Sequence, residues 1–201
     1  MLKPMLLTDS SNMPVGHDWI YETKYDGFRC ILLWEKGIQR PVLKSRNGNI
    51  FNEKFPEIIE FCEGIYEDVA PHLPLSFDGE LVYLLNNFQS KFSVVQKRGK
   101  MKNAKRIETY ARSFPCHYIV FDLLQFEGKS YTNSDLTARK QHLKKFFVIQ
   151  NLSIGVDYTS KQRIMVIDTF TDGQLLYEKV QSHNSEGIIA KKGNSTWVEA
   201  S

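Results

Sequence analysis

The sequence predicts an α+β fold with mostly antiparallel sheets, flanking helices and a nucleotide-sized polar cleft between the sheets. Two observations support this prediction. Short apolar runs typical of strands outnumber helical segments, and turns or long helical excursions join them. Several of these apolar strands also carry one isolated charged residue, and charges are rarely buried unless they are paired or bound.

The composition is that of an ordinary globular protein. The chain has 201 residues, 42% of them hydrophobic and 24% charged, which suffices for one domain with a proper core or for two small ones. No apolar run approaches the roughly 18 residues that span a bilayer, and residues 1–7 are too short and Pro-broken for a secretory signal. The three cysteines are far apart and form no CxxC pair, so we expect reduced thiols in the cytoplasm. The net charge of +3 permits a nucleic-acid partner but does not by itself argue for one.

The first element is a predicted hairpin around Asp26-Gly27. An Asp-Gly step between two strand-like runs, here 19–21 and 30–34, is the local signal for a tight reversal. Alternate side chains of an extended segment share a face, so Lys24 and Asp26 should lie together, with Arg29 beyond the turn. For an arbitrary sequence this pattern is most often a surface hairpin with solvated charges.

The remaining elements follow from hydrophobic periodicity and from caps. Further strands are predicted at residues 41–45, 75–85, 117–124, 164–170 and 185–192. Helices are predicted at residues 55–66, 91–96, 135–147 and 172–180. The basic run 97–106 predicts a solvated loop. If the protein binds duplex DNA, this run becomes a candidate segment for contacts with the phosphates.

Charged residues embedded in these strands indicate where chemistry occurs. Asp78 and Glu80 are two apart and so project from one face of their strand. Lys24, Asp122 and Glu186 also stand within or beside apolar strands, and hard oxygen ligands of this kind suit Mg²⁺ or Mn²⁺. The sequence has no His/Cys cluster for zinc, no P-loop and no GxGxxG motif.

Five motifs in order resemble those of the covalent nucleotidyltransferases, and among these the ATP-dependent DNA ligases. They are KYDGFR (24–29), SRNG (45–48), DGEL (78–81), FDLL (121–124) and EGIIAK (186–191). The residues of these motifs are most similar to those of the ligase domain of bacterial multifunctional end-joining ligases, and the resemblance covers essentially the whole chain. A KxDG motif alone is weak, but this ordered set is specific. The resemblance implies the adenylation-domain fold of ligases, which is ATP-grasp-like.

The resemblance also implies a reaction. The lysine of KxDG, here Lys24, attacks the α-phosphorus of ATP, expels pyrophosphate and holds AMP as a phosphoramidate. The AMP then passes to a DNA 5′-phosphate, and a 3′-hydroxyl displaces it to seal the nick. An ordinary lysine is almost all ammonium at neutral pH, so partial burial and the nearby cations Arg29 and Lys191 are expected to lower the pKa of Lys24.

Further residue roles come from the same resemblance. The implied cofactor-binding residues are Glu22, Arg29, Arg46, Glu80, Phe121 and Lys191. Among these, Glu22 would help read the adenine amine, Arg29 and Glu80 would touch the ribose, and Arg46 would lie near the phosphates or the DNA backbone. Phe121 would stack on adenine, although composition alone favours a core residue there. Glu186 would bind the metal, and the possible supporting residues are Asp26, Asp78 and Asp122.

After EGIIAK the family continues with an apolar W-x-K-x-K strand and an oligonucleotide-binding barrel. Trp197-Val198-Glu199 carries no such lysine, so we expect residues 1–201 to be an adenylation domain without its last lysine-bearing strand and barrel, weak or inactive in complete nick sealing.

Two alternatives stay open: an RNA ligase or capping-type nucleotidyltransferase, and a non-catalytic nucleotide- or DNA-binding remnant. NAD⁺ is disfavoured as the adenylate donor. The expected partners are ATP, nicked or broken duplex DNA and end-joining repair proteins, in the bacterial cytoplasm close to the nucleoid and away from membranes.

Overall fold

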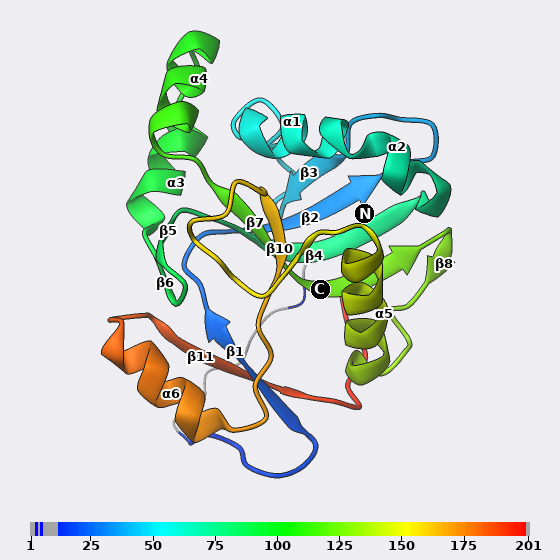
Figure 1. Ribbon diagram of the computed structural model, residues 1–201, viewed down its shortest axis with the longest axis vertical. Helices are drawn as coiled ribbons and strands as arrows, with labels where there is room; N and C mark the ends of the chain where they lie inside the picture. Colours follow the sequence, from blue (N-terminus) through cyan, green and yellow to red (C-terminus); the bar gives the residue numbers. More distant parts are fainter. Residues whose placement is uncertain (1–2, 4, 6–11, 200–201) are drawn as a thin grey trace.

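The computed structural model describes residues 3, 5 and 12–199 and is built around a seven-stranded sheet (Figure 1). Its strands run in the order β3 (Val42–Ser45), β2 (Phe28–Trp34), β4 (Leu75–Val82), β7 (His117–Phe126), β10 (Ile164–Val166) and β9 (Ser153–Ile154), with β8 (Lys129–Ser130) paired to β7. The first four strands are antiparallel neighbours, whereas β10 runs parallel to both β7 and β9. The predicted mostly antiparallel sheet is therefore confirmed, with a parallel edge.

A second, two-stranded sheet is formed by β1 (Trp19–Lys24) and β11 (Gly187–Lys192), which are distant in the sequence. Helix α6 (Gly173–Ser182) packs on this small sheet through Leu176 and Val180, and Asp172 caps its first turn as predicted. A third pair, β5 (Leu84–Asn86) and β6 (Gln89–Ser90), forms a short hairpin. The small sheet lies apart from the large one, and segment 25–27 joins them (Figure 1).

The main core lies between the large sheet and its helices. Helices α1 (Pro56–Gly64), α2 (Tyr66–Val69) and the 3₁₀ turn Ala70–His72 follow β3, and α5 (Leu136–Ile149) follows β8. Buried residues of α1 and α5 belong to one hydrophobic cluster with the sheet, including Ile58, Leu143 and Phe147. Burying these apolar faces is what holds the amphipathic helices in place.

The predicted hairpin at Asp26-Gly27 is wrong. Strand β1 pairs with β11, and β2 pairs with β3 and β4, so the chain crosses from one sheet to the other at 25–27. Gly27 does not have a positive φ. Instead, a Cβ on Gly27 would lie 2.1 Å from the carbonyl oxygen of Leu81, so a glycine is needed for close approach of two backbones.

The basic run 97–106 is also not a loop. It forms the end of α3 (Phe92–Lys100), a three-residue break and the start of α4 (Ala104–Ser113). One member, Arg98, is fully buried and ion-paired with Glu57. The other helices match the predictions closely, but the strand predicted at 164–170 ends at Val166. No helix in the described residues could cross a membrane.

Candidate active site

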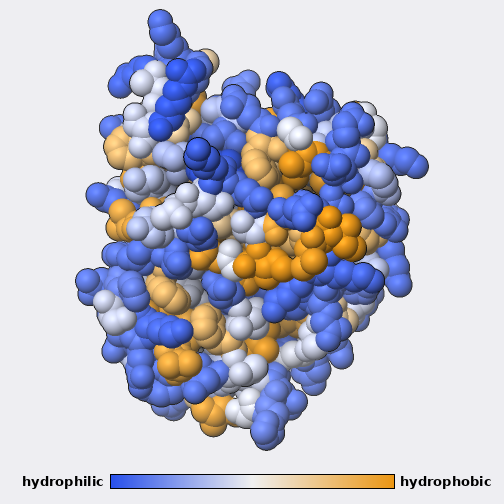
Figure 2. All heavy atoms as spheres, in the orientation of Figure 1, coloured by the Kyte–Doolittle hydropathy of each residue, from blue (hydrophilic) through white to orange (hydrophobic). Residues whose placement is uncertain are grey.

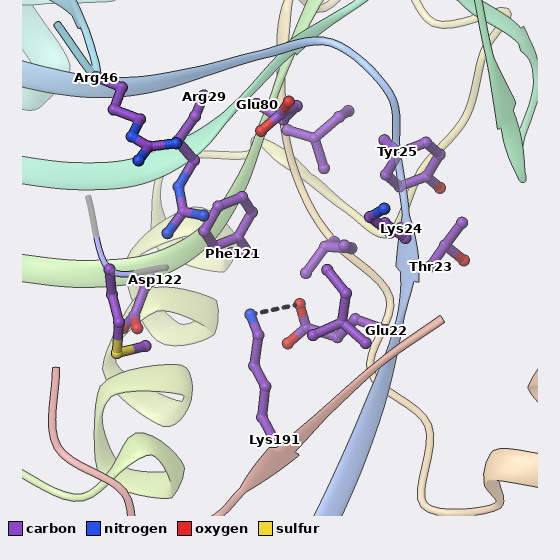
Figure 3. Close-up of a pocket in the computed structure, with 14 residues that line it drawn as sticks. Glu22, Thr23, Lys24, Tyr25, Arg29, Arg46, Glu80, Phe121, Asp122 and Lys191 are labelled. Atoms are coloured by element: carbon purple, nitrogen blue, oxygen red, sulfur yellow. Dashed lines mark hydrogen bonds and ion pairs between the residues drawn. The ribbon is translucent and has the colours of Figure 1, made fainter. Parts of the chain in front are cut away.

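A cavity of about 240 Å³ opens between the two sheets, as the polar cleft was predicted to do (Figure 3). Residues of β1, β2, β4, β7 and β11 line it, including Glu22, Thr23, Lys24, Arg29, Glu80, Phe121, Asp122 and Lys191. Tyr25, directly after β1, and Arg46, directly after β3, complete this part of the lining. Seven residues predicted from the sequence to bind or react with a nucleotide therefore line one cavity: Glu22, Lys24, Arg29, Arg46, Glu80, Phe121 and Lys191.

Lys24 is the last residue of β1, at the point where the chain leaves the small sheet. Its Nζ lies 2.6 Å from Oε1 of Glu186, which comes directly before β11, and the two side chains are 41% and 40% exposed. Glu22 and Lys24 project from the same face of β1, because side chains alternate along a strand. The Lys24 amine is thus held beside a carboxylate, and Lys24 lines the cavity. The expected neighbours Arg29 and Lys191 contact other acids in this structure.

Arg29 is fixed by a bidentate ion pair. Its Nε and Nη2 each donate to one oxygen of Asp78, both at 2.7 Å. Burial lowers the pKa of Arg29, but Asp78 more than offsets this effect, so the guanidinium stays charged. Its Cζ lies 4.5 Å from the centre of the Phe121 ring. Asp78 is therefore buried behind Arg29 rather than exposed to the cavity.

Glu80 lies opposite Arg29 in the β2–β4 register and faces the cavity. Burial raises its pKa to about 8, Arg29 opposes that shift, and Asp78 and Asp26 add to it. This shift favours the protonated form of Glu80 at neutral pH, and a protonated carboxyl group can donate a hydrogen bond to a hydroxyl group.

The largest omission from the sequence analysis is Lys140 on α5. Glu22 is fully buried, and its carboxylate contacts both Lys140 and Lys191, the latter at 3.2 Å. The preceding residue, Arg139, is also buried and forms a bidentate pair with Asp122 at 2.7 and 3.0 Å. A signal was present: Arg139 and Lys140 fall on the apolar stripe that Leu136 and Leu143 define, where a surface charge does not belong.

Two predicted supporting acids lie in different surroundings. The Asp122 carboxylate lines the cavity but is occupied by Arg139, which gives it a structural contact. Asp26 is exposed, and its backbone is bound to the Ser90 hydroxyl on β6. Burial and Glu186 raise the pKa of Asp26 and Lys24 lowers it, which places these three groups near one another.

A divalent metal would find few protein ligands here. Among residues 3, 5 and 12–199, no three His, Cys, Asp or Glu side chains converge into a metal site. Glu186 supplies one carboxylate. Mg²⁺ is commonly held by one or two carboxylates together with substrate phosphates and water, so a single acid beside a phosphate site fits that mode of binding.

Comparison with known proteins agrees with this geometry. The family model described as "ATP dependent DNA ligase domain" matches residues 4–201. The chain is 36% identical over 199 residues to the bifunctional non-homologous end joining protein LigD of Bacillus subtilis, covering 98% of this chain and 32% of that protein. It is 28% identical to the multifunctional LigD of Mycobacterium tuberculosis, of which it covers 22%. The chain thus spans a third or less of these two relatives.

Solved structures share the fold. The ligase domain of M. tuberculosis LigD superposes with a TM-score of 0.74 at 24% identity, covering 99% of this chain and 56% of that one. A mycobacterial DNA ligase D complexed with ATP and MES gives a TM-score of 0.71 at 23% identity, over 99% of this chain and 56% of that one. The ordered motifs, the two-sheet fold and the match over nearly the whole sequence lead to one conclusion: this chain belongs to the ATP-dependent DNA ligase domain family.

Proposed function

We propose that this chain is an adenylation domain in which Lys24 attacks the α-phosphorus of ATP. The observation that carries the proposal is the position of Lys24 at the rim of a cavity lined by Arg29, Arg46 and Lys191, which suit phosphate, and by Phe121, which suits a base. A bond forms between Nζ and the α-phosphorus, the bond to the bridging oxygen breaks, and pyrophosphate leaves with the electron pair.

Attack requires the neutral amine, so Lys24 must give up a proton. Glu186, at 2.6 Å from Nζ, is placed to take up that proton. Glu186 is also the carboxylate that would hold Mg²⁺ or Mn²⁺ together with phosphate oxygens. A divalent ion bound there would neutralise charge on the phosphates, which is the main task in phosphoryl transfer.

The other roles follow the shape of the cavity. Phe121 would stack on adenine, with Glu22 near the exocyclic amine. Arg29 and the protonated Glu80 would bind the ribose hydroxyls. Arg46 and Lys191 would contact phosphate oxygens, while Asp78 and Asp122 hold their arginines and Asp26 supports the segment beside Lys24.

The onward substrate we propose is nicked or broken duplex DNA, in bacterial end joining beside the nucleoid. The names of the relatives with LigD-type ligase domains support this extension. The AMP would move from Lys24 to a DNA 5′-phosphate: the phosphorus–nitrogen bond breaks and a phosphorus–oxygen bond forms. The exposed lysines of α3, α4 and their connection, described below, supply cations for the DNA backbone.

Intact mass spectrometry tests the first step directly. The chain is measured as purified and after separate incubations with ATP and with GTP, each with Mg²⁺ or Mn²⁺. Lys24→Ala and the exposed control Lys145→Ala are measured beside it. We expect an AMP adduct in the wild type and the control but not in Lys24→Ala. ATP binding without an adduct would instead identify a nucleotide-binding module, and an adduct formed only from GTP would identify a capping-type enzyme.

A further inference from the structure

A buried cluster of one acid and two lysines lies against the floor of the cavity. Glu22 is 0% exposed, Lys140 is 6% exposed, and the Lys191 side chain is 14% exposed. One oxygen of Glu22 contacts Lys140. The other oxygen lies 3.2 Å from Nζ of Lys191, and Figure 3 shows this pair. The three residues come from β1, α5 and β11, so only the folded chain assembles them.

The cluster carries a surplus positive charge on its cavity side. Burial raises the pKa of Glu22, but Lys140 and Lys191 more than offset this and hold that pKa below its ordinary value. Burial lowers the pKa of Lys140 to about 8, Glu22 raises it and Lys191 lowers it, so Lys140 is mostly charged at neutral pH. Two cations thus share one anion. Lys191 and Glu22 line the cavity, and Nζ of Lys191 lies 4.5 Å from the centre of Phe121.

We propose that Lys140 is a positioning residue for ATP: it occupies one oxygen of Glu22 and so leaves the charge of Lys191 available to the nucleotide. The inference rests on the proposed function, because it takes ATP as the occupant of the cavity. Lys140 itself reaches the cavity only through Glu22, so it acts by controlling another residue.

The physical argument compares the cluster with and without Lys140. With Lys140, Glu22 is already neutralised, and the second pair with Lys191 is correspondingly weaker. Without Lys140, a fully buried carboxylate would have Lys191 as its remaining cation, and a buried charge binds its remaining partner tightly because the alternative is an unpaired ion. Lys191 would then be held against Glu22, and the cluster would be neutral toward phosphate.

Helix α5 also supplies a cation that pairs with a second acid of the cavity. Arg139, next to Lys140, binds both oxygens of Asp122, which also lines the cavity. Two successive residues of one helix therefore fix two acids on neighbouring walls. This arrangement makes α5 a support for the site rather than only a cover for the sheet.

The test measures ATP affinity by calorimetry in a Lys24→Ala background, which cannot form the adduct. Lys140→Met should weaken ATP binding about tenfold, the size of one lost hydrogen bond to a charged group. Lys140→Arg should restore affinity to within about threefold, because it keeps the charge. Lys144→Met, an exposed position on the same helix, should leave affinity unchanged.

A second pair of variants separates positioning from folding and from a direct charge effect. In a Glu22→Gln background, Lys140→Met should change ATP affinity less than about twofold, because the carboxylate that Lys140 contacts is then absent. An equal loss in both backgrounds would overturn the inference, as would unchanged affinity in Lys140→Met alone. Adduct formation is read separately: ATP binding without an adduct in the wild type would refute the adenylation step and leave this result standing, whereas no ATP binding would refute both.

Discussion

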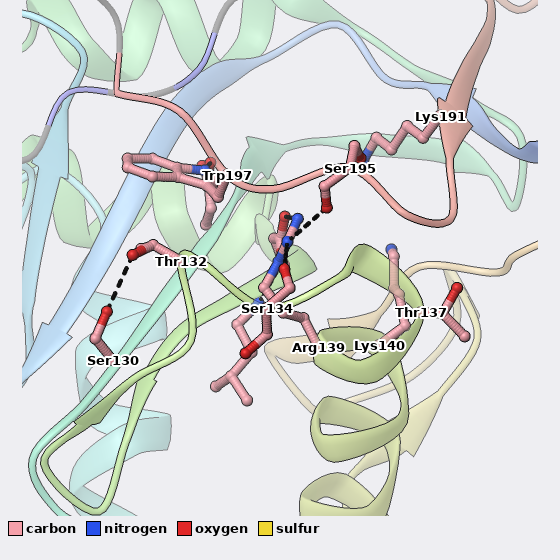
Figure 4. Close-up of polar contacts among 12 residues, drawn as sticks. Ser130, Thr132, Ser134, Thr137, Arg139, Lys140, Lys191, Ser195 and Trp197 are labelled. Carbon is pink, nitrogen blue, oxygen red and sulfur yellow. Dashed lines mark hydrogen bonds and ion pairs between the residues drawn. The ribbon is translucent and has the colours of Figure 1, made fainter.

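The indole nitrogen of Trp197 donates a hydrogen bond to Oδ2 of Asp78 over 3.0 Å, and the same carboxylate receives both Nε and Nη2 of Arg29. Trp197 is 5% exposed and packs with Ile31 and Leu124. The segment that carries Ser195 and Trp197 lies beside the start of α5 (Figure 4). The first backbone N–H groups of α5 donate to the carbonyl oxygens of Gly193 and Ser195. A residue after the last strand thus holds an arginine of the cavity through Asp78.

Trp197→Phe should therefore weaken both stability and ATP binding. Removing the indole N–H deletes one bond to a buried carboxylate, so we expect a loss of about 1.5 kcal/mol in the free energy of unfolding and a several-fold weaker ATP affinity. Trp34→Phe is the matched control, because its buried indole donates to the backbone of Ile38 instead. Urea unfolding and calorimetry check both effects. Equal ATP affinity in the two variants would contradict the link to Arg29.

Gly27→Ala should destabilise the protein because the added methyl group has no room. Its Cβ would lie 2.1 Å from the Leu81 oxygen and 2.9 Å from Cγ1 of Val82. We expect a loss of about 2 kcal/mol or more in the free energy of unfolding. Gly64→Ala, where no atom lies within 4 Å of the new methyl group, should be neutral or more stable by about 0.5 kcal/mol. Urea denaturation of both variants measures these changes. An unchanged stability of Gly27→Ala would show that residue 27 can move away from β4.

Glu80→Gln should flatten the pH dependence of stability. Burial raises the pKa of Glu80 from 4.5 to about 8 in the folded state. Between these two values the folded chain binds more protons than the unfolded chain, so Glu80 makes stability fall as pH rises through that window. A neutral glutamine removes this dependence. The free energy of unfolding of the variant should fall by about 3 kcal/mol less than that of the wild type between roughly pH 5 and pH 8.

The exposed Glu178→Gln variant is the control for that experiment. The free energy of unfolding of this control should depend on pH in the same way as that of the wild type. If Glu80→Gln follows the wild type as well, Glu80 is ionised in the folded protein and could only accept hydrogen bonds from a ribose.

Neutralising Lys100, Lys102 and Lys105 should weaken DNA binding and leave self-adenylation intact. These exposed lysines lie on the arm formed by α3, α4 and their connection, which presents mainly hydrophilic side chains (Figures 1 and 2). A groove of about 440 Å³ on the arm is lined by Lys97, Lys105 and Arg106 together with Tyr110 and Phe114. We plot the logarithm of the DNA association constant against the logarithm of the salt concentration. Replacing the three lysines by glutamine should make the slope of this plot less steep by about 0.9 for each phosphate contact that is lost.

A triple variant with the same loss of charge elsewhere, Lys144, Lys145 and Lys161 each to Gln, is the control. Salt-dependent binding to a nicked duplex, measured by fluorescence anisotropy, compares the two. The arm has no role in DNA binding if both variants bind alike, and it has a role in the nucleotide step if the arm variant also loses the adduct.

The class of fold, the helices and the motif residues that line the cavity could be predicted from the amino-acid sequence. Hydrophobic periodicity and caps are local signals, so α1, α5 and α6 begin close to where they were expected. The ordered motifs indicated Lys24, Arg29, Glu80 and Phe121, because each motif carries its own residue types within a few positions.

The strand pairing and the burial of particular charges could not be predicted, because both depend on contacts between residues far apart in the sequence. The Asp-Gly step at 26–27 indicates a reversal of the chain. Strand pairing depends on contacts distant in the sequence, however, and β1 pairs with β11 instead of with β2. Lys140 and Arg98 look like surface cations because their acids, Glu22 and Glu57, lie 118 and 41 residues away in the sequence. A buried ion pair needs both partners brought together by the core, and no local pattern records that distance.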